Sequence, residues 1–129
     1  MRGAHQTALT IAFLLLAGLP VQAQSRIPWV TNWPEASAAA KAQQRLVLIH
    51  FWSKNCPPCL KLEQAVFNRP EVIRSITTNY VPLKVDVDAA PQLAEYYRVM
   101  QWPTDGIVSP EGAEICRTPS SQDPNRFIA

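Results

Sequence analysis

The sequence predicts an α/β fold with a central mixed β-sheet flanked by helices, and three observations carry this prediction. The segment 46–52 is a continuous apolar run, which is typical of a strand buried on both faces in a parallel sheet. The segment 80–87 alternates apolar and polar side chains, as a second strand does. Helical patterns lie between the two strands, so the pair is predicted to be parallel, and a later hairpin adds an antiparallel edge.

The helices are predicted before, between and after these strands. Asn32 followed three residues later by Glu35 resembles a capping box, and the segment 36–45, rich in Ala, Lys and Gln, favours a helix. Three further segments are predicted to be helical: 60–67, 71–78 and 91–98.

The last part of the chain is predicted to form a hairpin and the start of a helix. Strands at 106–108 and 113–117 enclose a Pro-Glu-Gly turn at 110–112. Asp123 and Pro124 have the types expected of a helix cap and first residue. Barely one helical turn follows, so we expect a fold whose final C-terminal helix is truncated.

The first 23 residues have the layout of a secretory signal peptide. Arg2 gives a basic start, residues 8–19 form an apolar run, and the small residue Ala23 fits a cleavage site directly after it. An uncleaved membrane anchor is the alternative, but about a dozen apolar residues are few against the roughly 20 that span a bilayer. We therefore expect a signal peptide at 1–23, a folded domain at 24–129, and export to the periplasm or the extracellular space. No stable membrane insertion is expected after cleavage.

Charge and cysteine content narrow the function classes. The chain has 12 Lys and Arg against 10 Asp and Glu, which gives no basic surface for nucleic acid, so no nucleic-acid partner is expected. Of its three cysteines, Cys56 and Cys59 are three residues apart and Cys116 is left over. This pattern indicates a redox pair and one extra cysteine rather than a disulfide framework.

The Cys56-Pro57-Pro58-Cys59 motif is suited to thiol–disulfide exchange. At a helix N-terminus the thiolate of Cys56 is stabilised by the helix dipole and free N–H groups, and Cys59, one turn inside, can attack a mixed disulfide. Pro57 and Pro58 have no N–H, so two donors are absent and a moderately reducing potential is expected. Lys54 acts in the opposite direction, although solvent screens it.

Two stretches resemble the thioredoxin family. VLIHFWSKNCPPC, from Val47 to Cys59, is similar to the family's active-site segment, and LKVDVDAAPQLAEYYRVMQWPT, from Leu83 to Thr104, is similar to its next strand, helix and cis-proline turn. The resemblance covers roughly residues 34–126. The pattern VF…PEV at 66–72 resembles exported thioredoxin-like proteins, including the C-terminal domain of periplasmic membrane thiol reductases.

The resemblance implies a thioredoxin-like fold and a thiol–disulfide oxidoreductase whose only redox group is the Cys56–Cys59 disulfide, with no other cofactor. It also implies that Pro103 is cis and packs beside the disulfide, the alternative being an ordinary trans proline. Protein thiols and disulfides are the implied substrates, with a membrane thiol as a possible electron donor. The residues expected to shape the substrate groove are Trp52, Pro57, Pro58, Trp102, Pro103 and Thr104.

Two residues keep alternative interpretations. Many thioredoxins have a buried acid at the position of His50. A neutral imidazole there can accept the proton of Cys59, or the ring can be packed with a backbone carbonyl as its partner. Cys116 is expected to be a small buried hydrophobe, with a mixed disulfide to a partner or a regulatory thiol as the alternatives.

The sequence is compatible with three functions, which differ in how well the motifs support them. The favoured one is disulfide exchange on proteins, leaning towards reduction. The alternative is a non-catalytic thioredoxin-fold binding module with a static Cys56–Cys59 disulfide. A metal-binding domain is disfavoured, and no metal site is expected, because one CxxC lacks the paired spacing of structural zinc sites; its ligands would be Cys56, Cys59, His50 and Cys116.

Overall fold

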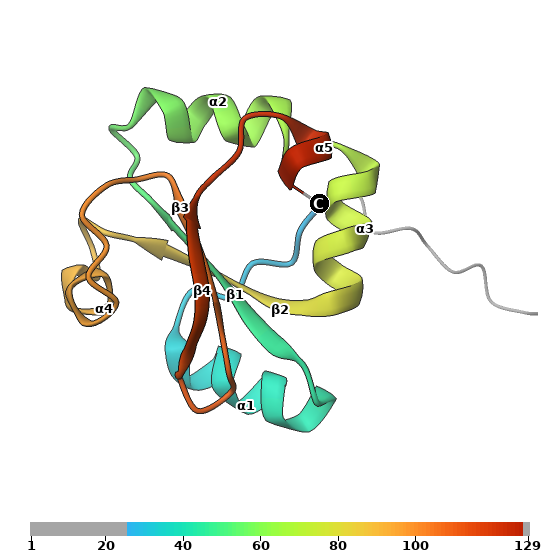
Figure 1. Ribbon diagram of the computed structural model, residues 1–129, viewed down its shortest axis with the longest axis vertical. Helices are drawn as coiled ribbons and strands as arrows, with labels where there is room; N and C mark the ends of the chain where they lie inside the picture. Colours follow the sequence, from blue (N-terminus) through green and yellow to red (C-terminus); the bar gives the residue numbers. More distant parts are fainter. Residues whose placement is uncertain (1–25, 128–129) are drawn as a thin grey trace, which may run out of the picture.

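The computed structural model describes residues 26–127, so the predicted signal peptide at 1–23 lies outside the described residues. Figure 1 shows a central sheet with helices on both sides. In chain order the elements are α1 (Trp33–Gln43), β1 (Leu46–Trp52), α2 (Pro57–Ala65), α3 (Pro70–Asn79), β2 (Tyr80–Asp86), α4 (Pro91–Tyr96), β3 (Thr104–Val108), β4 (Glu114–Pro119) and α5 (Pro124–Phe127).

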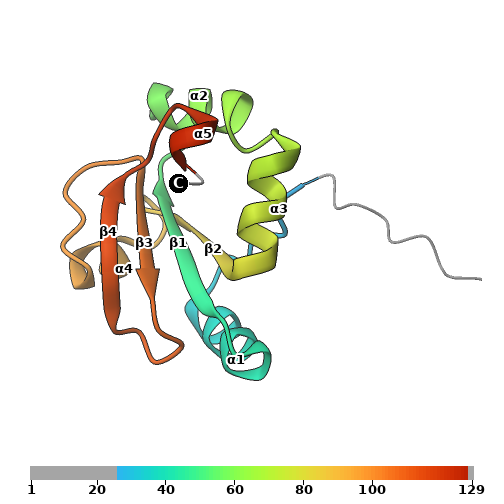
Figure 2. The ribbon, with the colours of Figure 1, turned by 45° about the vertical axis from the view of Figure 1, so that its right-hand side comes forward.

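The four strands form one mixed sheet in the order β2-β1-β3-β4, which confirms the predicted fold class. β1 is parallel to β2, with Leu46 opposite Tyr80, and antiparallel to β3. β4 pairs antiparallel with β3 as the edge of the hairpin (Figure 2). The apolar run of β1 therefore lies in the interior of the sheet, where both of its faces are covered.

Each face of the sheet has its own apolar cluster. One cluster joins alternate residues of β1, among them Ile49 and Phe51, to α1 and α4. The other joins Leu48 on the opposite face of β1 to the buried sides of α2 and α3. Side chains alternate between the faces of a strand, so His50, two residues after Leu48, is on the α2 side.

The helix boundaries follow local signals. Asn32 caps α1 as predicted, because its side-chain oxygen accepts the N–H of Glu35 at 3.0 Å. α2 begins at Pro57, three residues earlier than expected, because two prolines are tolerated in the first turn of a helix. α4 ends at Tyr96 rather than residue 98, where Arg98 has a φ of +52° that interrupts helical geometry.

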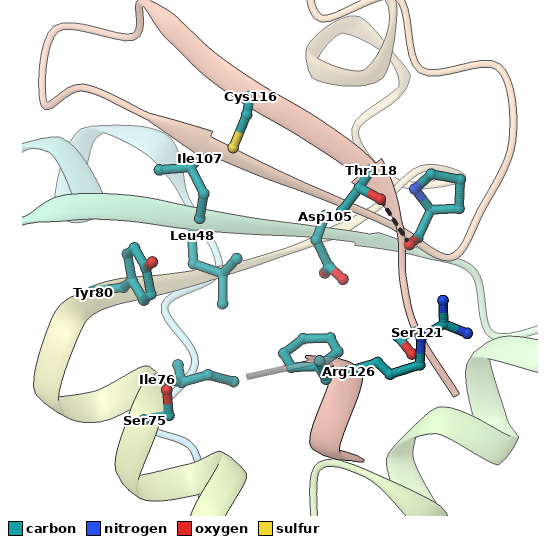
Figure 3. Close-up of a pocket in the computed structure, with 12 residues that line it drawn as sticks. Leu48, Ser75, Ile76, Tyr80, Asp105, Ile107, Cys116, Thr118, Ser121 and Arg126 are labelled. Carbon is teal, nitrogen blue, oxygen red and sulfur yellow. Dashed lines mark hydrogen bonds between the residues drawn. The ribbon is translucent and has the colours of Figure 1, made fainter. Parts of the chain in front are cut away.

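The expectation that Cys116 is buried was wrong. Cys116 is exposed on β4, the outermost strand, and all six residues of that strand are exposed. A cavity of about 390 Å³ lies between this hairpin, α3 and α5, and Cys116 and Ile107 are in its wall (Figure 3). Burial of an edge strand depends on an element packing over it, and the two apolar clusters do not include β4.

The short helix α5 packs against the segment that links α2 and α3. The ring centroid of Phe127 is 5.3 Å from that of Phe67, in an edge-to-face arrangement. Among the described residues, 26–127, there is no helix with the length and apolar character needed to cross a bilayer.

Candidate active site

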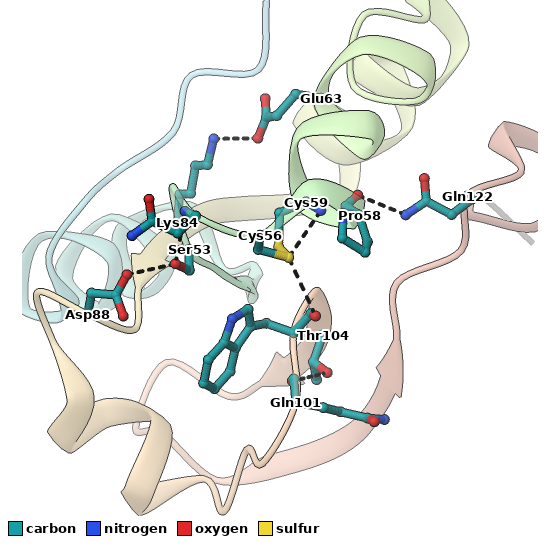
Figure 4. The surroundings of a disulfide bond; sticks show 12 residues. Ser53, Cys56, Pro58, Cys59, Glu63, Lys84, Asp88, Gln101, Thr104 and Gln122 are labelled. Carbon is teal, nitrogen blue, oxygen red and sulfur yellow. Dashed lines mark hydrogen bonds and ion pairs between the residues drawn. A yellow bond between two sulfur atoms is a disulfide. The ribbon is translucent and has the colours of Figure 1, made fainter.

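The cysteine pair lies where β1 passes into α2. Cys56 and Cys59 form a disulfide with a Cα–Cα separation of 5.2 Å (Figure 4). Cys56 is the N-cap of α2, in extended conformation, and Cys59 lies in its first turn. Cys56 is 7% exposed and Cys59 is fully buried, so the two sulfur atoms differ in their access to solvent.

One backbone hydrogen bond reaches the Cys56 sulfur. The N–H of Cys59 donates to Cys56 Sγ at 3.2 Å, as a residue at the third helical position does to an N-cap side chain. Pro57 and Pro58 occupy the two positions between them and have no N–H to donate. In the reduced protein, a Cys56 thiolate at the positive end of α2 is therefore stabilised by the helix dipole and by one N–H donor rather than two.

The loop before β3 faces the disulfide. The Trp102–Pro103 peptide bond is cis, as predicted, and the carbonyl oxygen of Trp102 is 3.7 Å from Cys56 Sγ (Figure 4). Thr104 is buried, and its hydroxyl donates to the carbonyl oxygen of Gln101 at 2.8 Å, which closes the turn. The contact between Trp102 and Cys56 brings together two segments that are 46 residues apart in the sequence.

The predicted groove residues divide by exposure. Pro57, Pro58 and Trp102 are exposed, and Pro103 is half-buried between them and the buried Thr104. These residues surround Cys56 from two elements, the start of α2 and the loop before β3. An exposed apolar rim next to a reactive sulfur is a suitable surface for a polypeptide.

Trp52 is half-buried at the end of β1, and its ring contacts a charged side chain. The ammonium of Lys84 is 4.2 Å from the Trp52 ring centroid, in a cation–π arrangement, and it also forms an ion pair with Glu63 of α2. Sequence reasoning missed the Lys84–Glu63 pair, because it depends on how α2 lies over β2.

A second missed interaction orders the loop that precedes Cys56. The hydroxyl of Ser53 donates to Asp88 Oδ2 at 2.7 Å and accepts the N–H of Asn55 at 3.2 Å. Asp86 Oδ1 in turn accepts the N–H of Asp88. Asp86 and Asp88 therefore hold loop geometry, and the part of the chain that the structure describes contains no group of three metal-ligating side chains.

His50 is fully buried in β1 and forms a pair with a carboxylate. Its Nδ1 is 2.7 Å from Asp105 Oδ1, and Asp105 is itself only 6% exposed. The partner is a side chain, so the interpretation with a backbone carbonyl was wrong. Within residues 26–127 the His50 Nε2 atom has no hydrogen-bond partner. The ring lies against Trp29 and Phe67, with centroids 5.7 and 4.9 Å away.

Asp105 is the site residue that sequence reasoning missed. It follows the Pro103-Thr104 turn directly, and pairing between β1 and β3 places it opposite His50. The available signal was an acidic residue at the start of a short strand. That signal is weak, because an aspartate beside a proline turn is equally typical of a loop.

Comparison with known proteins shows which family shares this arrangement of a CxxC disulfide and a cis-proline loop. Residues 33–129 match the thioredoxin-like domain family. A thioredoxin of Chlamydia trachomatis serovar D is 34% identical over 83 residues, which are 64% of this chain and 76% of that protein. Thioredoxin-1 of Drosophila yakuba is 35% identical over 63 residues, which are 49% of this chain and 56% of that protein. The match to the Drosophila protein thus spans little more than half of its length.

Two solved structures show the same architecture. A thioredoxin from Thermus thermophilus superposes with a TM-score of 0.69 and 34% identity, covering 81% of this chain and 83% of that one. The C-terminal domain of DsbD from Neisseria meningitidis has a TM-score of 0.65 at 19% identity, covering 78% and 93%, which is a likeness of fold. With its CxxC disulfide at the start of α2 and its cis-proline loop beside it, the chain belongs to the thioredoxin-like domain family.

Proposed function

We propose that the protein is a thiol–disulfide oxidoreductase that acts on protein disulfides through Cys56 and Cys59 and works as a reductase. The observation that carries this proposal is the asymmetry of the pair. The Cys56 sulfur is at the helix N-terminus beside the Trp102 carbonyl, whereas Cys59 is fully buried one turn inside. Attack on a substrate is therefore assigned to Cys56 and resolution to Cys59.

The reaction balances without a dissociable cofactor. The Cys56 thiolate attacks a substrate disulfide, forming a mixed disulfide and releasing one substrate thiolate, which takes up a proton. Cys59 then loses its proton and attacks Cys56 Sγ, which releases the second substrate thiol and forms the Cys56–Cys59 disulfide. Two electrons pass from the dithiol to the substrate, and the observed oxidised pair is the product state.

His50 is proposed as the acceptor of the Cys59 proton. It is buried on the face of β1 that α2 covers, and Cys59 is buried on the inner side of α2. A neutral imidazole has a suitable proton affinity for this transfer, which can run directly or through one water. The same burial excludes bulk solvent, so the site itself has to supply the base.

The groove around Cys56 is proposed to hold an extended segment of the substrate. Trp102 is 39% exposed next to the disulfide, and the cis Pro103 follows it. Trp52, Pro57, Pro58 and Thr104 complete the proposed groove. An exposed indole supplies a large contact area for an unfolded or extended polypeptide.

The lean towards reduction rests on the proline at the second helical position of α2. Because Pro58 withholds an N–H group from the Cys56 sulfur, the thiolate is less stabilised and the dithiol gives up its electrons more readily. A reductase also needs an electron source. For an exported protein, as the first 23 residues predict, we propose a thiol of a membrane protein as that donor, and a periplasmic or extracellular location.

A turnover assay tests this proposal. Reduction of an interchain disulfide in a small protein substrate is followed with a dithiol as electron source, in the presence of the wild type, Cys56→Ser, Cys59→Ser or Cys116→Ser. The wild type and Cys116→Ser should turn over, since Cys116 is exposed on β4 away from the pair. Cys56→Ser should be inactive, and Cys59→Ser should accumulate a mixed disulfide. Inactive wild-type protein with a disulfide that resists reduction would indicate a static binding module.

A further inference from the structure

Three neighbouring strands place a row of ionisable side chains beneath α2. The register pairs His50 of β1 with Lys84 of β2 on one side and with Asp105 of β3 on the other. Directly opposed residues share one face of a sheet, so all three lie on the α2 side. We call Lys84, His50 and Asp105 the polar row.

The Asp105 carboxylate determines which nitrogen of His50 carries hydrogen. An ionised carboxylate has acceptor atoms only, so at a distance of 2.7 Å the His50 Nδ1 is the donor. In the neutral imidazole the lone pair is then on Nε2. Among the described residues nothing donates to that atom, although it is buried. Leaving a buried acceptor without a hydrogen-bond partner costs free energy and therefore calls for an explanation. Accepting a proton during the reaction is such an explanation for His50 Nε2.

Two basic side chains, Lys84 and Arg126, lie near His50 and Asp105. Lys84 is bound to Glu63 of α2 and stacks on Trp52, so it does not compete for the imidazole. Arg126 of α5 lines the same cavity as Asp105, and Figure 3 shows the Asp105 carboxylate directed from β3 towards α5.

We propose that Asp105 is a positioning residue of the redox site. Its carboxylate holds His50 with the Nε2 lone pair available for the Cys59 proton, and it stabilises the imidazolium that forms after the transfer. During resolution the proton moves from Cys59 Sγ to His50 Nε2, and it leaves with the departing substrate thiolate when the Cys56–Cys59 bond closes. This inference rests on the proposed function, because it concerns the second half of the same reaction.

A single-turnover reaction separates the two halves. The reduced protein is mixed with a chromogenic aryl disulfide, which releases one coloured thiolate when Cys56 attacks and a second when Cys59 resolves. In Asp105→Asn the amide can donate to Nδ1, which moves the proton of the imidazole to Nε2 and blocks the acceptor. We expect an unchanged first phase and a second phase slowed at least about tenfold, given that a general base contributes 10²–10⁴-fold.

The pH profile distinguishes positioning from damage to the fold. The slow second phase of Asp105→Asn should recover as the pH rises, because Cys59 then ionises without a base. The matched control is Asp123→Asn, the same change at an exposed carboxyl that caps α5, and both phases should remain at wild-type rates. A deficit in Asp105→Asn that affects both phases equally, or that alkali does not relieve, would overturn the proposal.

A measurement on the wild type is independent of any variant. In protein with ¹⁵N-labelled histidine, the His50 resonances, identified by their loss in His50→Gln, should show a protonated Nδ1 and a bare Nε2. The opposite tautomer would overturn the inference. Normal two-phase release by wild type together with unchanged rates in Asp105→Asn would refute this inference alone. Wild-type protein that releases neither thiolate would refute the proposed function and this inference with it.

Discussion

Replacing Pro58 by Ala adds one hydrogen-bond donor at the Cys56 sulfur. Cys56 is the N-cap of α2, and an N-cap side chain accepts N–H groups from the second and third helical positions. The third, Cys59, already donates at 3.2 Å, and the second is Pro58, which has no N–H. The Pro58→Ala variant should therefore give the thiolate a second donor in a position that the helix already fixes.

The size of the effect follows from the charge of the acceptor. A hydrogen bond to a charged group contributes about 1.5–3 kcal/mol, and sulfur is a weak acceptor, so we take about 1.5 kcal/mol. Since one pKa unit corresponds to about 1.36 kcal/mol, the pKa of Cys56 should fall by about one unit. A tenfold change for a two-electron couple is about 30 mV, so the reduction potential should become more positive by up to about 30 mV.

Two assays measure this change. The ultraviolet absorbance of the thiolate as a function of pH gives the pKa of Cys56 in the reduced protein, and equilibration with glutathione gives the potential. Pro57→Ala is the matched control, because it also removes a proline but adds an N–H at the first helical position, which is not aimed at the N-cap side chain. Equal shifts in the two variants, or no shift in Pro58→Ala, would refute the reasoning.

Three further predictions concern the fold. Leu62→Ala removes a fully buried side chain of α2 and should lower the free energy of unfolding in urea by about 2–5 kcal/mol; a loss below about 1 kcal/mol would show that the cluster repacks. Gly112→Ala should lower it by about 1 kcal/mol or more, because Gly112 has a φ of +95° and a Cβ would lie 3.3 Å from the Trp33 ring; unchanged stability would contradict this. Burial raises the pKa of the Tyr97 phenol, so above pH 10, where the unfolded chain loses this proton first, stability should fall. Below pH 10 this contribution is fully present, and Tyr97→Phe should show a smaller alkaline loss in thermal unfolding.

Much of the fold could be predicted because the signals for it are local. The apolar run of β1 and the alternation of β2 report burial directly, and the cap at Asn32 is a short-range pattern. The start of α2 was placed three residues late because proline is a helix breaker in the interior but not in the first turn. Local composition does not distinguish those two positions.

The parts of the site that could not be predicted depend on register between distant strands. Asp105 meets His50 only because β3 pairs antiparallel with β1 in one particular register, and a shift of one residue would turn its side chain to the other face. The exposure of Cys116 depends likewise on whether another element covers β4. Neither property is present in the sequence around the residue itself.

The central claim is that Cys56 and Cys59 form a reversible redox couple, and its equilibrium reduction potential against glutathione tests this most directly. The account predicts a two-electron couple below the glutathione poise of about −180 to −210 mV that prevails in an oxidising compartment such as the endoplasmic reticulum. A potential near about −120 mV would mark a disulfide donor and contradict the reductase assignment. A pair that stays oxidised at every physiological poise would contradict exchange altogether.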